Sequence, residues 1–175
     1  MSTSGTVASF ITPSNQEIQN FESPLIFNRN DTDTERKLAA FDPSLANTYR
    51  EIGQVYHGTT ADPTRAAMAL MRQVFDHFFT VLAPDDLVRQ SPYWHEKNEE
   101  EADLITRRER ITYAAFTHVR DRARAETMVA NITVILDAYK ILNKIHERGS
   151  ISEEQARTAL KTMKEFIENW TDAIG

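Results

Sequence analysis

The chain has 175 residues, of which 41% are hydrophobic, and this size favours one domain with a substantial core. It contains no cysteine, which excludes disulfides, thiolate metal sites and cysteine nucleophiles. No apolar run approaches the roughly 20 residues that a membrane-spanning helix requires, and the first residues lack the basic region of a secretory signal. We therefore expect a cytoplasmic protein without membrane contact.

The net charge of −6 argues against a broad nucleic-acid-coating surface. Arginines nevertheless gather in two stretches, TRRERITY (106–113) and HVRDRARAE (118–126). Because positive charge at the start of a helix opposes its dipole, these arginines need anionic partners. One hypothesis is a solvated face that pairs with the acidic run at 99–103, and the other is contact with nucleic acid or an acidic protein. The candidate contact residues are Arg107, Arg108, Arg110, Arg120, Arg122 and Arg124.

Residues 1–37 are predicted to form an extended or flexible tail, since they are rich in serine, threonine and asparagine and show no helical period. Two apolar clusters in this tail, Phe10-Ile11 and residues 24–27, are candidates for docking on the body or on another chain. A simple flexible extension is the alternative. The remaining residues, 38–175, are predicted to form a helical bundle domain.

The first two predicted helices begin with the same signal, an aspartate followed by proline. Asp42-Pro43 opens a helix that ends near residues 57–60, and Asp62-Pro63 opens one that ends at about residue 82. Aspartate caps a helix well, and proline is tolerated in the first turn. The short connection between these helices predicts an antiparallel hairpin. A polar connector follows from about residue 87 to residue 104.

A long helical region is predicted from about residue 106 to residue 147, because neither glycine nor proline occurs between Pro92 and Gly149. The charged stretch around Asp121 is the expected break, with that aspartate as a cap. The second half carries one buried seam with spacings of three and four, formed by Met128, Ile132, Ile135, Tyr139, Leu142 and His146. Ser152 and Gln155 then form a capping box that opens a last helix. Together, these predicted helices indicate an all-α, up-and-down bundle of four to five helices.

His146 is the first candidate catalytic residue, because it ends the seam near a predicted helix C-terminus. Asn143 shares roughly its face, and Lys140 lies about 120° round an ideal helix. The helix dipole favours a protonated histidine at this end. A protonated His146 suits a general acid/base, and it equally suits a structural histidine that bonds a backbone carbonyl.

Arg72, Asp76 and His77 form a second candidate set within MRQVFDHFF (71–79). Five residues separate Arg72 from His77, about 140° on an unbroken helix, so the two side chains should diverge. The alternative is that Asp76 or His77 makes a buried polar bond to a neighbouring helix. HExxH, ExxH and glycine-rich phosphate motifs are absent from the sequence, so we expect no metal and no cofactor.

Several stretches resemble one superfamily. AMALMRQVFDHFFTVLAPDD resembles the second-helix segment of HEPN-type domains, and is similar to that of the predicted pPIWI-associating nucleases of bacterial defence loci. FDPSLANTYREIGQVY resembles the preceding helix of that group, and TRRERITYAAF resembles its basic motif. KILNKIHERGSISEEQARTALKTMKEFIENW is similar to the end of many HEPN domains. The resemblance covers about residues 38–172.

The resemblance implies an arginine and a histidine four to six residues apart, acting without metal across a dimer. His146 matches the histidine, Asn143 matches a polar position, and the arginine should lie at residues 139–141. Those positions hold Tyr139, Lys140 and Ile141, and lysine lacks the planar fork with which arginine grips a phosphate. The catalytic motif is therefore expected to be degenerate.

The leading hypothesis is a helical module of an anti-phage or toxin–antitoxin-like system that contacts protein or RNA, as a homodimer or with a protein partner. The alternatives are an active metal-independent endoribonuclease that uses His146, and a purely structural subunit of a larger assembly.

Overall fold

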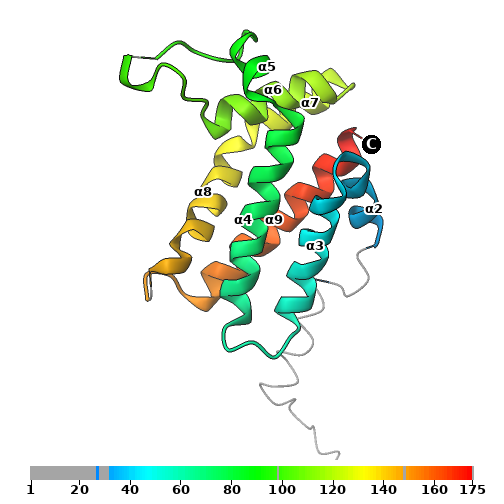
Figure 1. Cartoon of the computed structure of the whole chain (residues 1–175), viewed down its shortest axis with the longest axis vertical. Coiled ribbons are helices and arrows are strands. Elements are labelled where there is room, and N and C mark those ends of the chain that lie inside the picture. Colours follow the sequence, from blue (N-terminus) through cyan, green and yellow to red (C-terminus); the bar gives the residue numbers. More distant parts are fainter. Residues whose placement is uncertain (1–26, 28–31, 98, 148, 175) are drawn as a thin grey trace, which may run out of the picture.

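The protein is an all-α bundle, as the sequence predicts (Figure 1). The computed structural model describes residue 27 and residues 32–97, 99–147 and 149–174, and this part of the chain contains helices and no strand. None of its helices combines the length and the apolar character needed to cross a membrane.

The first described helix, α2 (Thr32–Phe41), was not predicted, because the first predicted helix begins at Asp42-Pro43. Residues 32–37 are helical although the sequence assigned them to the tail, because the buried Leu38 anchors α2 on the bundle. Phe27 is also buried, and its ring lies 5.3 Å from that of Tyr56. Phe27, the last residue of the apolar cluster at 24–27, therefore packs on the body, while the other tail residues to which docking was assigned lie outside the described part. The division into tail and bundle domain stays a prediction.

The predicted hairpin is formed by α3 (Pro43–Tyr56) and α4 (Pro63–Leu82), which pack along one another (Figure 1). Both predicted caps are present. Asp42 accepts a hydrogen bond from the Ser44 backbone N–H at 2.8 Å, and Asp62 accepts one from the Arg65 backbone N–H at 3.1 Å.

The connector between α4 and the next long helix holds two short elements, α5 (Asp85–Arg89) and the 3₁₀ turn η1 (Glu99–Glu101). Helix α6 (Arg107–His118) then begins with a capping box formed by Thr106 and Glu109. This box fixes the direction in which the arginines of the first turn leave the backbone.

The predicted region 106–147 is divided into α6, α7 (Arg122–Ala130), α8 (Ile132–Asn143) and the 3₁₀ turn η2 (Lys144–His146). Asp121 caps α7 by accepting from the Arg124 backbone N–H at 3.0 Å, which confirms the predicted break. A second break at Asn131 was not predicted. The predictions that the helix runs to about residue 147 and the seam to His146 are wrong, because the α-helix ends at Asn143. The wider step of a 3₁₀ turn, about 120° per residue, rotates His146 off the seam, and its side chain is exposed.

The last helix, α9 (Glu153–Ile174), lies against α4 and α8. Its predicted inner face is buried, and Trp170 is fully enclosed. An aromatic cluster fills the contact between α4 and α9, with a ring-centroid distance of 4.8 Å between Phe79 and Trp170. Its members are Phe75, Phe78, Phe79, Phe166 and Trp170. This core joins α4 to α9, and α8 lies against both helices.

Candidate functional site at the junction of α4, α6 and α8

Three polar side chains from three helices meet at the edge of the core. The Tyr139 hydroxyl on α8 donates to Asp76 Oδ2 on α4 at 2.6 Å. Arg107, the first residue of α6, donates through Nη2 to the Tyr139 oxygen at 2.7 Å and through Nε to Asp76 Oδ1 at 3.2 Å. We call these three residues the Asp76 cluster.

Local sequence places each member of the Asp76 cluster. Tyr139 occupies a seam position, so its ring packs at 5.0 Å from that of Phe75 while its hydroxyl faces Asp76 at the edge of the core. Asp76 follows Phe75 and lies beside the buried stripe of α4. The Arg107 guanidinium lies 4.1 Å from the centre of the Tyr139 ring, a cation–π contact that holds it in place.

The electrostatics of the cluster favour binding an anion over removing a proton. The pKa of Tyr139 is raised to about 12. Burial is the largest cause, the hydrogen bond to Asp76 and the charge of Asp76 contribute to the rise, and the charges of Arg107 and Arg72 oppose it. The phenol is therefore a hydrogen-bond donor at neutral pH. Both oxygens of Asp76 already accept bonds. Arg107 has five N–H donors, of which two are used within the cluster, and its side chain is 48% exposed.

A depression of about 450 Å³ lies beside the cluster, between α4 and the start of α6. Arg110 lines it and is held inside the protein, since it donates to the Ala83 carbonyl at 2.5 Å and to Asp85 at 2.6 Å. The lining residues are Phe75, Asp76, Phe79, Thr80, Leu104, Ile105, Thr106, Arg107, Arg110 and Ile111. The depression thus combines apolar side chains with two arginines, two threonine hydroxyls and the Asp76 carboxylate.

The remaining arginine candidates do not converge on this site. Arg108 donates to the Thr133 hydroxyl at 2.9 Å on the neighbouring face of α8. Arg122 pairs with Glu126 at 3.0 Å, and Arg124 donates to the Asn169 side chain at 3.0 Å. Arg120 is exposed. The carboxylates that pair with Arg107 and Arg110 come from α4 and α5, outside the acidic run at 99–103 to which the sequence pointed.

The second predicted set is divided between two sides of α4. His77 Nε2 lies 2.9 Å from Asp42 Oδ2 at the start of α3, whereas Asp76 faces α8. The charge of Arg72 acts on Tyr139, so Arg72 lies on the side of Asp76 and diverges from His77 as the helix geometry predicts. Both Asp76 and His77 make polar bonds to a neighbouring element: the bond between Asp76 and the buried Tyr139 is partly buried, and the bond between His77 and Asp42 is exposed.

The first predicted set lies on the exposed end of α8 and the following turn. Lys140 pairs with Asp137 at 3.2 Å, and the side chains of Asn143 and His146 are exposed. Lys140 follows Tyr139 directly, yet it points to solvent while Tyr139 points to Asp76. The catalytic roles assigned to Lys140, Asn143 and His146 stay predictions.

Sequence reasoning missed Tyr139 as a site residue because it read the position as core. The available signal was its hydroxyl, since a tyrosine in an apolar seam usually finds a polar partner. Within the described residues, no group of three or more histidine or acidic side chains is arranged to hold a metal ion.

Residues 39–170 match the family model described as the predicted pPIWI-associating nuclease. The match includes all three members of the Asp76 cluster. Comparison with curated proteins and with solved structures finds no match to the chain.

Proposed function

Because the chain belongs to the predicted pPIWI-associating nuclease family, we propose that it is a nucleic-acid-directed, HEPN-like helical module of a bacterial defence system. In this proposal the Asp76 cluster, together with Arg72 and Arg108, contacts RNA phosphates. Contact is the main role, and the catalytic motif around His146 is degenerate. The module acts in the cytoplasm as a homodimer or with a protein partner.

The observation that carries the proposal is that the Arg107 guanidinium is held by two bonds and is still partly exposed to solvent. Asp76 and Tyr139 fix its guanidinium at the rim of a depression while about half of the side chain stays open to solvent. A fixed guanidinium loses little further freedom on binding and offers paired donors to a phosphate. Arg72 lies one turn before Asp76, and Arg108 bonds a hydroxyl, so the positive charges outnumber the single carboxylate of the cluster.

The state of the other two cluster members supports binding over cleavage. A general base needs a free acceptor whose pKa is near the working pH. The pKa of Tyr139 is raised to about 12, and the Asp76 oxygens are engaged. A phosphodiester at this site would meet the remaining N–H donors of Arg107 beside the partly exposed carboxylate of Asp76, whose two oxygens already accept bonds.

The test is RNA affinity, measured by fluorescence anisotropy with a mixed-sequence single-stranded RNA at several salt concentrations. Arg107→Ala is expected to weaken binding about tenfold, the effect of losing one charge-assisted contact, and to lower the salt slope by about 1. Arg107→Lys should recover only part of the affinity because the planar fork is lost. Arg36→Ala on α2, an exposed arginine paired with Asp33, is the matched control and should bind like the unmodified protein.

Incubation of the same RNA with the protein in EDTA distinguishes RNA binding from metal-independent RNA cleavage. We expect no cleavage that depends on His146. Cleavage by the unmodified protein that disappears in His146→Ala would instead establish the ribonuclease hypothesis. Equal RNA affinity of the unmodified protein, Arg107→Ala and Arg36→Ala would overturn the Asp76 cluster as a phosphate site.

A further inference from the structure

The depression beside the Asp76 cluster is larger than a single phosphate contact requires. Arg107 lies at its rim, whereas its volume of about 450 Å³ falls within the range of about 300–1,000 Å³ found for small-molecule sites. Leu104, which is 49% exposed, and the neighbouring Ile105 line this volume. Apolar side chains offer nothing to a phosphate, so the phosphate contact of the proposed function leaves most of the depression without an assigned ligand.

Hydrogen bonds fix the wall that carries Leu104. Its carbonyl oxygen accepts from Trp94 Nε1 at 3.3 Å and from Lys97 Nζ at 2.7 Å. On α4, the hydroxyl of Thr80, which also lines the depression, donates to the Asp76 carbonyl at 2.8 Å. A preformed wall loses little conformational freedom when a ligand binds, so the depression is suited to a small, rigid ligand.

The Asp76 carboxylate has capacity for further hydrogen bonds. A carboxylate accepts at about four lone-pair positions, and Arg107 and Tyr139 occupy one position on each oxygen. The Asp76 side chain is 42% exposed and lines the depression. The depression therefore offers a fixed guanidinium for an anion, apolar side chains for a flat ring and a carboxylate for N–H groups. A nucleotide carries all three complements: a phosphate, the faces of its base and the N–H groups at the base edge.

We propose that the depression binds one unpaired nucleotide of RNA, with its phosphate on Arg107 and its base against Leu104 and Ile105. This inference rests on the proposed function, because it takes Arg107 as the phosphate contact, and it adds the base as the second part of the ligand. The bases of a duplex are stacked and paired, so only an unpaired nucleotide can place its base in the depression. The site should therefore favour single-stranded RNA, and a free mononucleotide should bind it.

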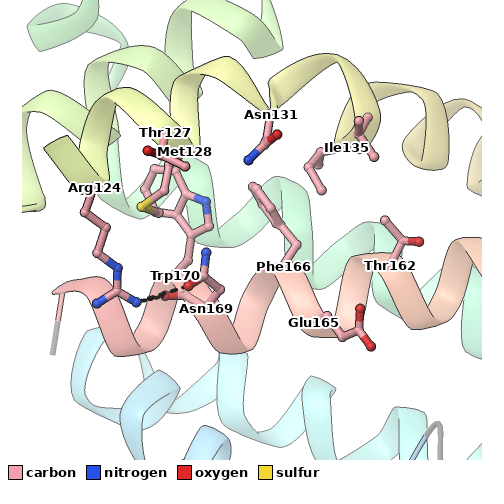
Figure 2. A pocket seen from close by; sticks show the side chains of 11 residues that line it. Arg124, Thr127, Met128, Asn131, Ile135, Thr162, Glu165, Phe166, Asn169 and Trp170 are labelled. Carbon is pink, nitrogen blue, oxygen red and sulfur yellow. Dashed lines mark hydrogen bonds between the residues drawn. The ribbon is translucent and has the colours of Figure 1, made fainter.

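A second depression, of about 530 Å³, lies between the α7–α8 junction and α9 and provides an internal comparison (Figure 2). Arg124 and Glu165 lie toward its opposite ends, so its charged side chains balance (Figure 2). At the Asp76 cluster, by contrast, the positive charges of Arg72 and Arg107 outnumber one carboxylate. An anionic nucleotide is therefore attracted to the Asp76 cluster more strongly than to the second depression.

Isothermal titration calorimetry with AMP and with ribose 5-phosphate tests the base contact, because both compounds carry the same phosphate. AMP is expected to bind about tenfold more tightly, through the apolar surface that its base buries. Thr80→Trp fills the depression and should remove this difference without changing the binding of ribose 5-phosphate. The matched control is Thr162→Trp in the second depression, since the hydroxyls of Thr80 and Thr162 each donate to the carbonyl four residues earlier.

The affinities for a single-stranded RNA and for the blunt duplex of the same sequence give a second readout. The unmodified protein and Thr162→Trp should prefer the single strand by a similar factor, and Thr80→Trp should bind both RNAs alike. Equal affinity of the unmodified protein for AMP and ribose 5-phosphate, or no binding of either, would overturn the nucleotide site whether or not Thr80→Trp folds. Loss of AMP binding in Thr162→Trp alone would also overturn it, by placing the nucleotide in the second depression.

The RNA affinity of Arg107→Ala distinguishes failure of this inference from failure of the proposed function. Weaker RNA binding by Arg107→Ala, together with equal affinities for AMP and ribose 5-phosphate, would leave the phosphate contact in place and remove only the base contact. Unchanged RNA binding by Arg107→Ala would remove the phosphate contact, and the nucleotide site with it.

Discussion

Replacing Phe79 by alanine is expected to lower the free energy of unfolding by about 3–5 kcal/mol, the range for removing a large aromatic side chain from a core. Phe79 is only 2% exposed, and its ring lies within 6 Å of four other aromatic rings. Its loss would remove apolar burial and leave a cavity at the contact between α4 and α9. That contact supports the part of α4 that carries Asp76.

Urea unfolding followed by circular dichroism at 222 nm measures this effect directly. Val134→Ala is the matched control, because Val134 is 59% exposed and its truncation should change stability little. Phe79→Leu should fall between the two, since most of the volume is kept. A loss below about 1 kcal/mol for Phe79→Ala would contradict this packing, because fully buried aromatic side chains cost more to remove.

Helix ends were the most predictable part of the fold, because their causes are local. Asp42-Pro43, Asp62-Pro63 and Asp121 each carry a cap within three residues of the backbone group that it satisfies. The break at Asn131 was missed because no glycine or proline marks it, and the Asn131 side chain makes no capping bond. Helix α2 was missed because its position depends on Leu38 being buried by other helices, which no local pattern reveals.

The candidate site was less predictable because it depends on tertiary contacts. Asp76 lies 31 residues from Arg107 and 63 residues from Tyr139 along the chain. The sequence identified Asp76 and Arg107 separately, in two motifs, and assigned Tyr139 to the core. Only the packing of α4, α6 and α8 shows that one tyrosine serves both purposes, with its ring inside and its hydroxyl at the site.

Glu109 is a buried carboxylate that holds together the residues at the start of α6, the helix that carries Arg107. Its side chain is 8% exposed and contacts Lys97 at 3.0 Å, and it accepts from the backbone N–H groups of Thr106 at 2.8 Å and His95 at 3.1 Å. These bonds tie the connector before α6 to the first turn of that helix. The start of α6, and with it Arg107, is therefore fixed by one buried charge.

Loss of this charge should destabilise the protein in a pH-dependent way. Burial alone raises the pKa of Glu109, but the hydrogen bonds from Thr106, Lys97 and His95 outweigh it and lower the pKa from 4.5 to about 2. The folded state thus holds fewer protons than the unfolded state in this range. The stabilisation is fully present above pH 4.5 and is lost as the pH falls toward 2. The pKa difference corresponds to roughly 3 kcal/mol.

Glu109→Gln keeps the size of the side chain and removes the charge, so it should cost about 3 kcal/mol at pH 7. The difference in unfolding free energy between the unmodified protein and Glu109→Gln should shrink as the pH falls from 4.5 toward 2, because the unmodified protein then loses the same charge. Urea unfolding at closely spaced pH values measures this difference, with the exposed Glu51→Gln on α3 as control. A difference that stays constant over this range would show that Glu109 stabilises the fold through its shape and hydrogen bonds, and that its charge does not hold the start of α6.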